Sequence, residues 1–441
     1  MTGHPGWLCL GGAEIVNQAR VSTYAQSLGC GGATISSCDS CGPEMAVALE
    51  DPNGVYTDPV TDAAPWYSAT EPESADFAGF YELSVTGLQP GNIVRTLTDR
   101  ASGRGSFLGP ETWDAPQVVV TGLLLGKTPC AVAYGYRWLR TALRGSACSD
   151  GCDGDDLTFL DCCPTWAPDG DPVTELDPHV RMLKGVKVIS SPQITARFGD
   201  SCACHESASM MQVTFTLAAT EPCVFREPVE VVSGVTFDLE NPEPCVTWIP
   251  IGDGEACPAL EDPCAPPPDC IVDPACPPPP APPAAPLPVN PCICTPLQQV
   301  KACAIIPTGA IPEWAEGVPI IRINSGSQDL RQIQMTFIPN PFNQPVSELD
   351  PCNACGQVTL SRIPANSQFV MDGTTQTVTI VCPGSGPTDA SALLGSTGGS
   401  LPFRFPEIDC GGIAYALCVT ADAITAAADA TISAEIAVRE C

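Results

Sequence analysis

The chain of 441 residues is poor in basic residues, with 19 Lys and Arg against 50 Asp and Glu and a formal net charge of −31. This imbalance argues against an anionic membrane or sequence-specific nucleic acid as a direct partner, because both attract basic surfaces. The simplest explanation of the charge is an acidic surface that keeps the protein soluble. The sequence also lacks any run of about eighteen apolar residues, so it predicts no membrane-spanning helix.

Residues that carry enzyme chemistry are scarce as well. The three histidines, His4, His179 and His205, lie far apart in the sequence, and no G-x-S-x-G elbow, P-loop or H-E-x-x-H motif occurs. The acidic stretch 150–156 lacks the glycine register and the distal glutamate of an EF-hand, so we interpret it as a solvated loop. We therefore expect no enzyme activity, no catalytic residue and no cofactor.

Cysteine, in contrast, is abundant. The sequence has 26 cysteines, which is typical of disulfide frameworks in oxidising compartments. Yet residues 1–9 contain no Lys or Arg and no apolar run of the length that a secretion signal needs. Two explanations fit this combination. Either the thiols hold metal in the cytosol, or the protein leaves the cell by another route, such as the release of virus particles by lysis.

The spacing of the cysteines bears on zinc and on disulfides. Cys38/Cys41 and Cys352/Cys355 have the C-x-x-C spacing of zinc knuckles, and the run 202–205 groups two cysteines with a histidine. Most other cysteines are scattered singly and the total number is even, so disulfides are favoured, and a metal site or mostly free thiols remain the alternatives. The candidate disulfide cysteines are Cys38, Cys41, Cys148, Cys152, Cys202, Cys204, Cys264, Cys270, Cys276, Cys292, Cys294, Cys352 and Cys355.

The composition changes along the chain. With 48 prolines and 39 glycines, turns and short strands should predominate over helices. Residues 251–296 are rich in proline and cysteine, and we interpret them as a stiff, polyproline-like connector that disulfides hold in place. This segment divides the chain into an N-terminal domain, 1–250, and a C-terminal domain, 297–441.

The N-terminal domain contains one strong helix pattern. Apolar residues in 129–143 recur on one helical face, and Gly145 is placed to end that helix. Residues 13–24 read as a strand followed by a short helix. The segments 117–125 and 211–217 are strand-like, the first as a buried run and the second by alternation.

The C-terminal domain reads as a series of short strands separated by turns, which is typical of an antiparallel sandwich. Its Ala-rich stretch 421–430 could form a helix by propensity, but within this domain we expect strand or loop. The strand-like segments are 318–324, 332–338, 356–360, 377–381, 414–419 and 434–438.

Two blocks of motifs follow one another along the chain. The first contains EIVNQAR at 14–20, DRASGRGS at 99–106, VVVTG at 118–122, YGYRWL at 134–139 and SSP at 190–192. The second contains IRINSG at 321–326, IQMTF at 333–337, IPANSQFVMDG at 363–373 and TVTI at 377–380. In this order and spacing the sequence resembles siphophage distal tail proteins, and most closely the minor tail proteins of actinobacterial phages such as mycobacteriophages.

The resemblance implies a mainly β fold. Its parts would be an N-terminal ring-forming β-belt domain with one helix and a C-terminal, galectin-like antiparallel β-sandwich. In that family the Asp372-Gly373 motif forms the turn of a hairpin, and such dipeptides favour hairpins in general. The candidate ring-interface residues are Arg20, Arg100, Arg104 and Asp372.

The resemblance also implies a role. Such proteins form closed rings, typically hexamers, at the distal end of the phage tail. They join the tail tube protein and the tape measure protein to the tail hub, the fibres and other minor tail proteins. The chain would be made in the host cytoplasm without a signal peptide and would end in the virion. A negatively charged lumen would let DNA slide through without sticking.

Two other functions remain open. A host-surface or carbohydrate-binding tail adhesin would bind a cell-surface glycan through the sandwich, where Trp314 and Tyr415 are the candidate aromatic residues. A tail-associated hydrolase is less favoured, because no carboxylate pair or nucleophile stands out. Since a phage protein folds in a reducing cytosol, we expect bridges mainly within loops and the connector, with few between central strands.

Overall fold

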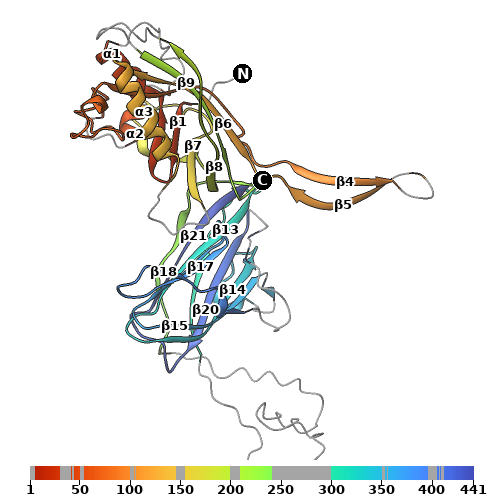
Figure 1. Ribbon diagram of the computed structural model, residues 1–441. Helices are drawn as coiled ribbons and strands as arrows, with labels where there is room; N and C mark the ends of the chain where they lie inside the picture. The colour runs from red at the N-terminus through yellow and green to blue at the C-terminus, as the bar shows by residue number, and fades with distance from the viewer. Residues whose placement is uncertain are drawn as a thin grey trace, which may run out of the picture.

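In the computed structural model, the described residues are 5–29, 41, 44–49, 54–99, 104, 106–145, 154–198, 209–240, 299–349, 353–354, 356–395, 405–406, 408 and 412–441. Across these residues the fold is mainly β, as the sequence analysis predicts, and most strands pair antiparallel in two lobes (Figure 1). None of the helices in these segments combines the length and the apolar character needed to cross a membrane.

The first lobe is organised around a long strand, β8 (Val180–Phe198), which belongs to two sheets. Its first half pairs with β7 (Asp155–Leu160) and its second half with β9 (Ser209–Ala218). Register shifts along the β8–β9 ladder bend the strand from one sheet into the other. One sheet has the order β2-β1-β7-β8 and the other β3-β6-β9-β8. The remaining strands are β1 (Trp7–Leu10), β2 (Ala13–Asn17), β3 (Phe77–Thr86) and β6 (Gln117–Gly126).

Helix α3 (Pro129–Ala142) packs against β3 and β6. It begins at an N-cap, Thr128, whose hydroxyl accepts a hydrogen bond from the backbone N–H of Ala131 at 3.1 Å. The predicted helix over 129–143 is confirmed, and so are the strand and helix predicted at 13–24. The other helices are α1 (Gln18–Ser27), α2 (Glu44–Ala48) and α4 (Pro172–Leu176), with short 3-10 turns η2 (Pro72–Ser74), η3 (Asp177–His179), η4 (Val346–Glu348) and η6 (Ser391–Leu393).

Aromatic rings hold α3 against the sheet β3-β6-β9-β8. The ring centroid of Trp66 lies 5.3 Å from that of Phe77 and 5.4 Å from that of Trp138, and both ring pairs are close to edge-to-face. Trp66 also donates its indole N–H to the carbonyl of Phe77 at 2.9 Å, so its polar group is satisfied in the core. Gly135 of α3 sits directly on the Phe77 ring, where a Cβ atom would overlap it.

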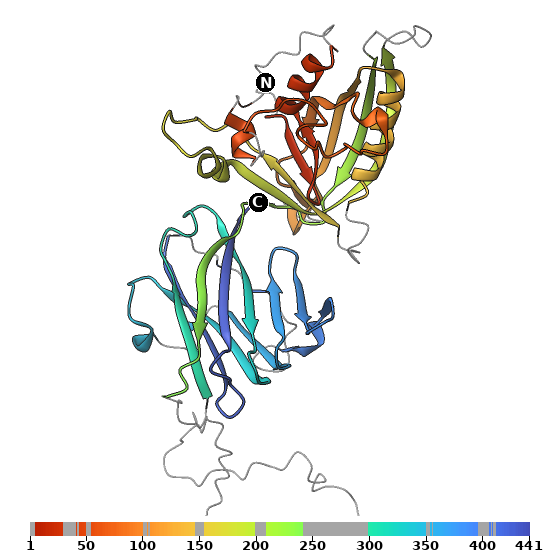
Figure 2. The ribbon, with the colours of Figure 1, turned by 90° about the vertical axis from the view of Figure 1, so that its left-hand side faces the viewer.

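The second lobe is the predicted sandwich (Figure 2). One sheet has the order β18-β17-β16-β13-β21 with β11 paired to β21, and the other is the five-stranded sheet β12-β20-β14-β15-β19. Phe337, Phe369 and Ile321 lie buried in the core between them. The strands are β11 (Val229–Thr236), β12 (Gln299–Ile306), β13 (Glu316–Asn324), β14 (Leu330–Asn340), β15 (Gly356–Ile363), β16 (Gln368–Asp372), β17 (Thr377–Val381), β18 (Pro387–Asp389), β19 (Leu394–Gly395), β20 (Ala414–Asp422) and β21 (Thr431–Glu440).

The order of these strands changes the domain division. Strand β11 pairs with β21 and contributes Val232 to the second core, although it falls within the range 1–250 that the sequence analysis assigned to the first domain. Residues 241–298 thus come between two strands of the sandwich, β11 and β12. The chain thus enters the sandwich at β11, before the Pro- and Cys-rich range 251–296, which lies outside the described residues.

The joint between the lobes is a strand of two residues, β10 (Val224–Phe225). It pairs antiparallel with β8 of the first lobe on one edge and with β21 of the second lobe on the other, so one 14-stranded sheet runs through both lobes. A disulfide between Cys223 and Cys441 spans the joint. Glu440 accepts from Arg226 at 2.6 Å and lies 3.5 Å from Arg181 of β8. The orientation of the sandwich is thus set by backbone pairing, a covalent bond and charge.

Two local expectations in the sandwich turn out as follows. Strand β20 ends at Asp422 and is followed by a turn, so the Ala-rich stretch 421–430 forms strand and loop as predicted. The hairpin β16–β17 is also present, but its turn is not a two-residue Asp-Gly turn. Asp372 accepts from the backbone N–H of Thr374 at 2.8 Å, and the left-handed residue is Gln376, with φ of 53°. Gly373 is required because a Cβ would lie 2.5 Å from Val318.

We predict that Gly135→Ala lowers the free energy of unfolding by about 1–3 kcal/mol, because the added methyl group overlaps the Phe77 ring in a packed core. Helix propensity alone predicts the opposite sign, a gain of about 1 kcal/mol. Urea denaturation followed by circular dichroism measures the difference. In a Phe77→Leu background the same substitution should cost less, and an increase in stability in the natural background would contradict the packing argument.

We predict that Cys441→Ser loosens the joint without unfolding either core. Hydrogen exchange at the amides of Val224 and Phe225 should become faster, because β10 then loses its covalent tie and depends on backbone pairing, nearby ion pairs and the packing of Phe225. Exchange measured by mass spectrometry tests this. Cys303→Ser, which removes a bridge inside the sandwich, is the matched control and should leave β10 unchanged. Equal acceleration of β10 in the two variants would show that the Cys223–Cys441 bridge has no special role there.

Candidate functional site

The most distinctive surface is a β-hairpin arm, formed by β4 (Ile93–Asp99) and β5 (Ser106–Trp113). These strands form a two-stranded sheet of their own, which continues the antiparallel pair β3–β6 beyond the body of the first lobe. Figure 1 shows the arm extending sideways, away from both lobes.

The pairing within the arm is set by its sequence. Arg95 lies opposite Glu111 and forms an ion pair with it, and Leu97 lies opposite Leu108. The arm begins where glycine permits a close approach of two backbones: Gly87 has φ of 89°, and a Cβ there would overlap the carbonyl oxygen of Gln117.

The side chains of the arm are too apolar for a surface that only meets water. Leu97, Phe107 and Leu108 are 71%, 61% and 65% exposed. An isolated two-stranded sheet is marginally stable in water, and contiguous exposed apolar residues mark binding surfaces. The arm is therefore a candidate binding surface.

The same lobe has further exposed apolar side chains. Val119 of β6 and Ile189 of β8 lie on the outer face of the sheet β3-β6-β9-β8, because their strand neighbours Val118, Val120 and Val188 point toward the core or pair with core residues. This outer face is a candidate contact surface.

The structure gives Arg20, a predicted ring-interface residue, a place in the core. Its Nε lies 2.9 Å from the carboxylate of Glu14, its Nη1 donates to the hydroxyl of Tyr24 at 3.2 Å, and its guanidinium stacks over the Tyr56 ring at 4.6 Å. The side chains of Arg20 and Glu14 are 11% and 15% exposed. Little of the Arg20 side chain is exposed for contact with another subunit.

Of the other predicted interface residues, the two that the structure describes do not gather with Arg20. Arg104 is exposed at the far end of the arm, next to β5, and Arg100 lies outside the described residues. Asp372 is in the β16–β17 turn of the sandwich, where its carboxylate accepts hydrogen bonds from that turn. The three described residues thus belong to separate elements, and an interface role for any of the four stays a prediction.

Of the candidate disulfide cysteines, Cys41 falls within the described residues, and its partner is Cys163 rather than its sequence neighbour Cys38. The remaining candidates lie outside the described residues: Cys38, Cys148, Cys152, Cys202, Cys204, Cys264, Cys270, Cys276, Cys292, Cys294, Cys352 and Cys355.

Two further bridges join cysteines that the sequence analysis left as scattered single residues. Cys223 pairs with Cys441 at the joint, and Cys303 pairs with Cys418. The second bridge lies within one sheet, between residues directly opposite each other in the edge strand β12 and its neighbour β20. Strand register, which brings their Cα atoms to 4.1 Å, explains the pairing, and spacing in the sequence contains no such signal.

The adhesin alternative depended on aromatic residues in a groove of the sandwich. Tyr415 is buried in the core between the two sheets, so it cannot stack on a glycan. Trp314 is exposed, but the guanidinium of Arg226 lies 5.5 Å from its ring centroid. The described part of the sandwich therefore does not pair these two residues on one surface.

Comparison with known proteins gives fold-level likenesses. No protein-family model matches the sequence, and no curated protein matches it. Among solved structures, the chain is similar to the crystal structure of the SPP1 Dit protein, described as a paradigm of the hub adsorption apparatus in phages that infect Gram-positive bacteria. The two sequences are 11% identical and the TM-score is 0.36. The match covers 82% of this chain and 93% of that one. The phage p2 baseplate, activated with Sr, has 7% identity and a TM-score of 0.34, with coverages of 85% and 93%. The same baseplate activated with Ca has 7% identity and a TM-score of 0.30, with coverages of 80% and 92%. Values this low assign no function by themselves.

We predict that Arg20→Ala lowers the free energy of unfolding by about 3–5 kcal/mol at neutral pH, because it leaves the Glu14 carboxylate buried without its counter-charge. Burial raises the pKa of Glu14 in the folded protein above its ordinary value. The folded state therefore binds the proton of the Glu14 carboxyl more tightly than the unfolded state. The stability lost in Arg20→Ala should grow as the pH rises through the folded pKa of Glu14, and it should shrink in acid.

Urea denaturation at several pH values measures this dependence. Arg104→Ala, at an exposed position of the arm, is the control and should leave stability unchanged. Adding Glu14→Gln to Arg20→Ala should recover part of the loss, since it removes the unpaired charge. If Arg20→Ala lowers the free energy of unfolding no more than Arg104→Ala does, the core role of Arg20 is contradicted and Arg20 is again a candidate surface contact.

Proposed function

We propose that the chain is a structural subunit of a phage tail, a distal tail or baseplate hub protein that assembles into a closed ring, typically a hexamer. The observation that carries the proposal is the exposed apolar arm β4–β5. The ordered motifs at 14–20, 99–106, 118–122 and 321–326 support the same role through their resemblance to siphophage distal tail proteins.

The partner of the arm is a second copy of this chain. The arm extends away from its own lobes, so it cannot fold back to cover its apolar residues. Each copy presents one arm and one apolar outer face on β3-β6-β9-β8. A contact between unlike surfaces of identical copies repeats around a rotation axis, and it produces a ring when the rotation closes.

In this role the first lobe forms the ring and the sandwich extends from it. The ring would sit at the end of the tail tube, with the tail tube protein and the tape measure protein on one side and the hub, fibres and other minor tail proteins on the other. The net charge of −31 suits a negative lumen through which DNA slides without sticking. A surface-potential map of the assembled ring with a neutral or positive lumen would contradict this part of the proposal.

The test of ring formation compares matched pairs of exposed residues. In Leu97→Ser/Phe107→Ser, two arm residues become polar, and we expect the full chain to stay folded and to lose its oligomer. Val119→Asp/Ile189→Asp on the outer sheet face should have the same effect. Phe342→Ser and Ile424→Ser change equally exposed apolar residues of the sandwich and should leave the oligomer intact.

Light scattering after size-exclusion chromatography gives the mass, and negative-stain electron microscopy gives the symmetry. A natural chain that stays monomeric, or arm variants that assemble normally, would contradict the proposal. In an intact particle, a six-fold ring coaxial with the tube supports the hub role, whereas a peripheral trimer supports the adhesin.

A further inference from the structure

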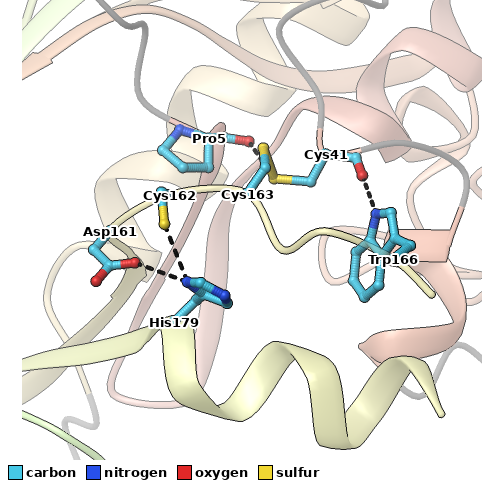
Figure 3. Close-up of a disulfide and its surroundings, with 7 residues drawn as sticks. All are labelled: Pro5, Cys41, Asp161, Cys162, Cys163, Trp166 and His179. Carbon is cyan, nitrogen blue, oxygen red and sulfur yellow. Dashed lines mark hydrogen bonds and ion pairs between the residues drawn. A yellow bond between two sulfur atoms is a disulfide. The ribbon is translucent and has the colours of Figure 1, made fainter. Parts of the chain in front are cut away.

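Three residues with metal-ligand chemistry meet where β7 ends and β8 begins (Figure 3). Asp161 and Cys162 follow β7, and His179 is the last residue of η3, which leads into β8. Backbone pairing fixes their separation, because the backbone N–H of Asp161 donates to the carbonyl of His179 at 3.1 Å beside the ladder of β7 and β8. The cluster thus lies at the end of a rigid strand pair.

The distances between the three side chains suit a small tetrahedral ion. Nδ1 of His179 lies 3.1 Å from Sγ of Cys162 and 3.4 Å from Oδ1 of Asp161. All three ligand atoms lie within 4.8 Å of one another. Metal–ligand bonds of about 2.0–2.3 Å place neighbouring ligands of a tetrahedral zinc ion roughly 3.3–3.6 Å apart. Small rotations of exposed side chains bring the observed distances into this range.

The surroundings complete the arrangement. Nη2 of Arg181 lies 2.7 Å from Oδ2 of Asp161, the oxygen that does not face the histidine, and so orients the carboxylate as outer-shell partners do at metal sites. Arg181 also lies 3.5 Å from Glu440, which offsets its positive charge. A groove of about 640 Å³ reaches Asp161, Cys162 and Arg181, so a water molecule can occupy a fourth ligand position.

We propose that Asp161, Cys162 and His179 bind a divalent transition-metal ion, Zn²⁺ by ligand chemistry, with a fourth position open to the groove. A thiolate, an imidazole and a carboxylate together favour zinc, whereas Ca²⁺ and Mg²⁺ require oxygen ligands. The ion ties the end of β7 to the start of β8, directly beside the joint between the two lobes. The site is separate from the ring interface proposed above and does not depend on it.

The test uses the full chain under non-reducing conditions, so that the neighbouring Cys41–Cys163 bridge stays intact. Iodoacetamide labelling with and without excess Zn²⁺, mapped by mass spectrometry, reports the reactivity of each thiol. We expect Zn²⁺ to slow labelling of Cys162 at least about tenfold, since the coordinated thiolate is no longer a free nucleophile. Cys130, an exposed free cysteine on α3, is the internal control and should label at the same rate in both conditions.

His179→Ala should abolish the protection of Cys162 while leaving its labelling without metal nearly unchanged. Bound Co²⁺ should show a thiolate charge-transfer band in the natural chain that is missing in Cys162→Ser, and Mg²⁺ should give no protection. Equal protection of Cys130 and Cys162, or protection that survives His179→Ala, would overturn the proposal. So would unchanged labelling of Cys162 in excess Zn²⁺.

Discussion

The arrangement of the molecule depends on the pairing of β10 with strands of both lobes. A strand of two residues forms few backbone hydrogen bonds, so it is a weak joint by itself. Here the Cys223–Cys441 bridge lies at one end of it, and Phe225 packs with Val318 and Ala437 in a small core of its own. Glu440 adds charge contacts to Arg181 and Arg226. Together these interactions join the two lobes, each with its own core, through one continuous sheet. They also fix the direction of the sandwich relative to the arm.

Assembly of such a chain has to overcome its own charge. Copies with a net charge of −31 repel each other at long range, although physiological salt screens this repulsion beyond about 8 Å. In the proposed ring, contacts between copies would therefore have to be short-ranged and apolar. The arm satisfies this condition, because Leu97, Phe107 and Leu108 are apolar and its ion pair Arg95–Glu111 is neutral overall.

The sequence predicts well what local pattern determines. Helix α3 has an N-cap, an initial proline and one apolar face, all close together in the sequence, and the structure has it from Pro129 to Ala142. The arm was not predicted, because alternation in β4 and β5 looks the same whether the partner is a core or another molecule. Only the exposure of Leu97 and Phe107 in the fold separates the two cases. Arg20, in contrast, looked like a surface residue and is nearly buried. Its ion pair with Glu14 is local in the sequence, but its burial depends on Tyr56 and on other residues packed around it.

The pairing of the cysteines also depends on contacts between residues that are far apart in the sequence. Cys303 and Cys418 are 115 residues apart in the sequence and become neighbours only through the register of β12 and β20. Cys162 presents the opposite problem, as a free thiol adjacent in sequence to the bridged Cys163. A free thiolate there can attack the Cys41–Cys163 bridge and exchange partners, with one thiolate released for each one consumed. A bound cation holds that thiolate as a ligand, so the proposed metal site would also keep the neighbouring bridge in a single pairing.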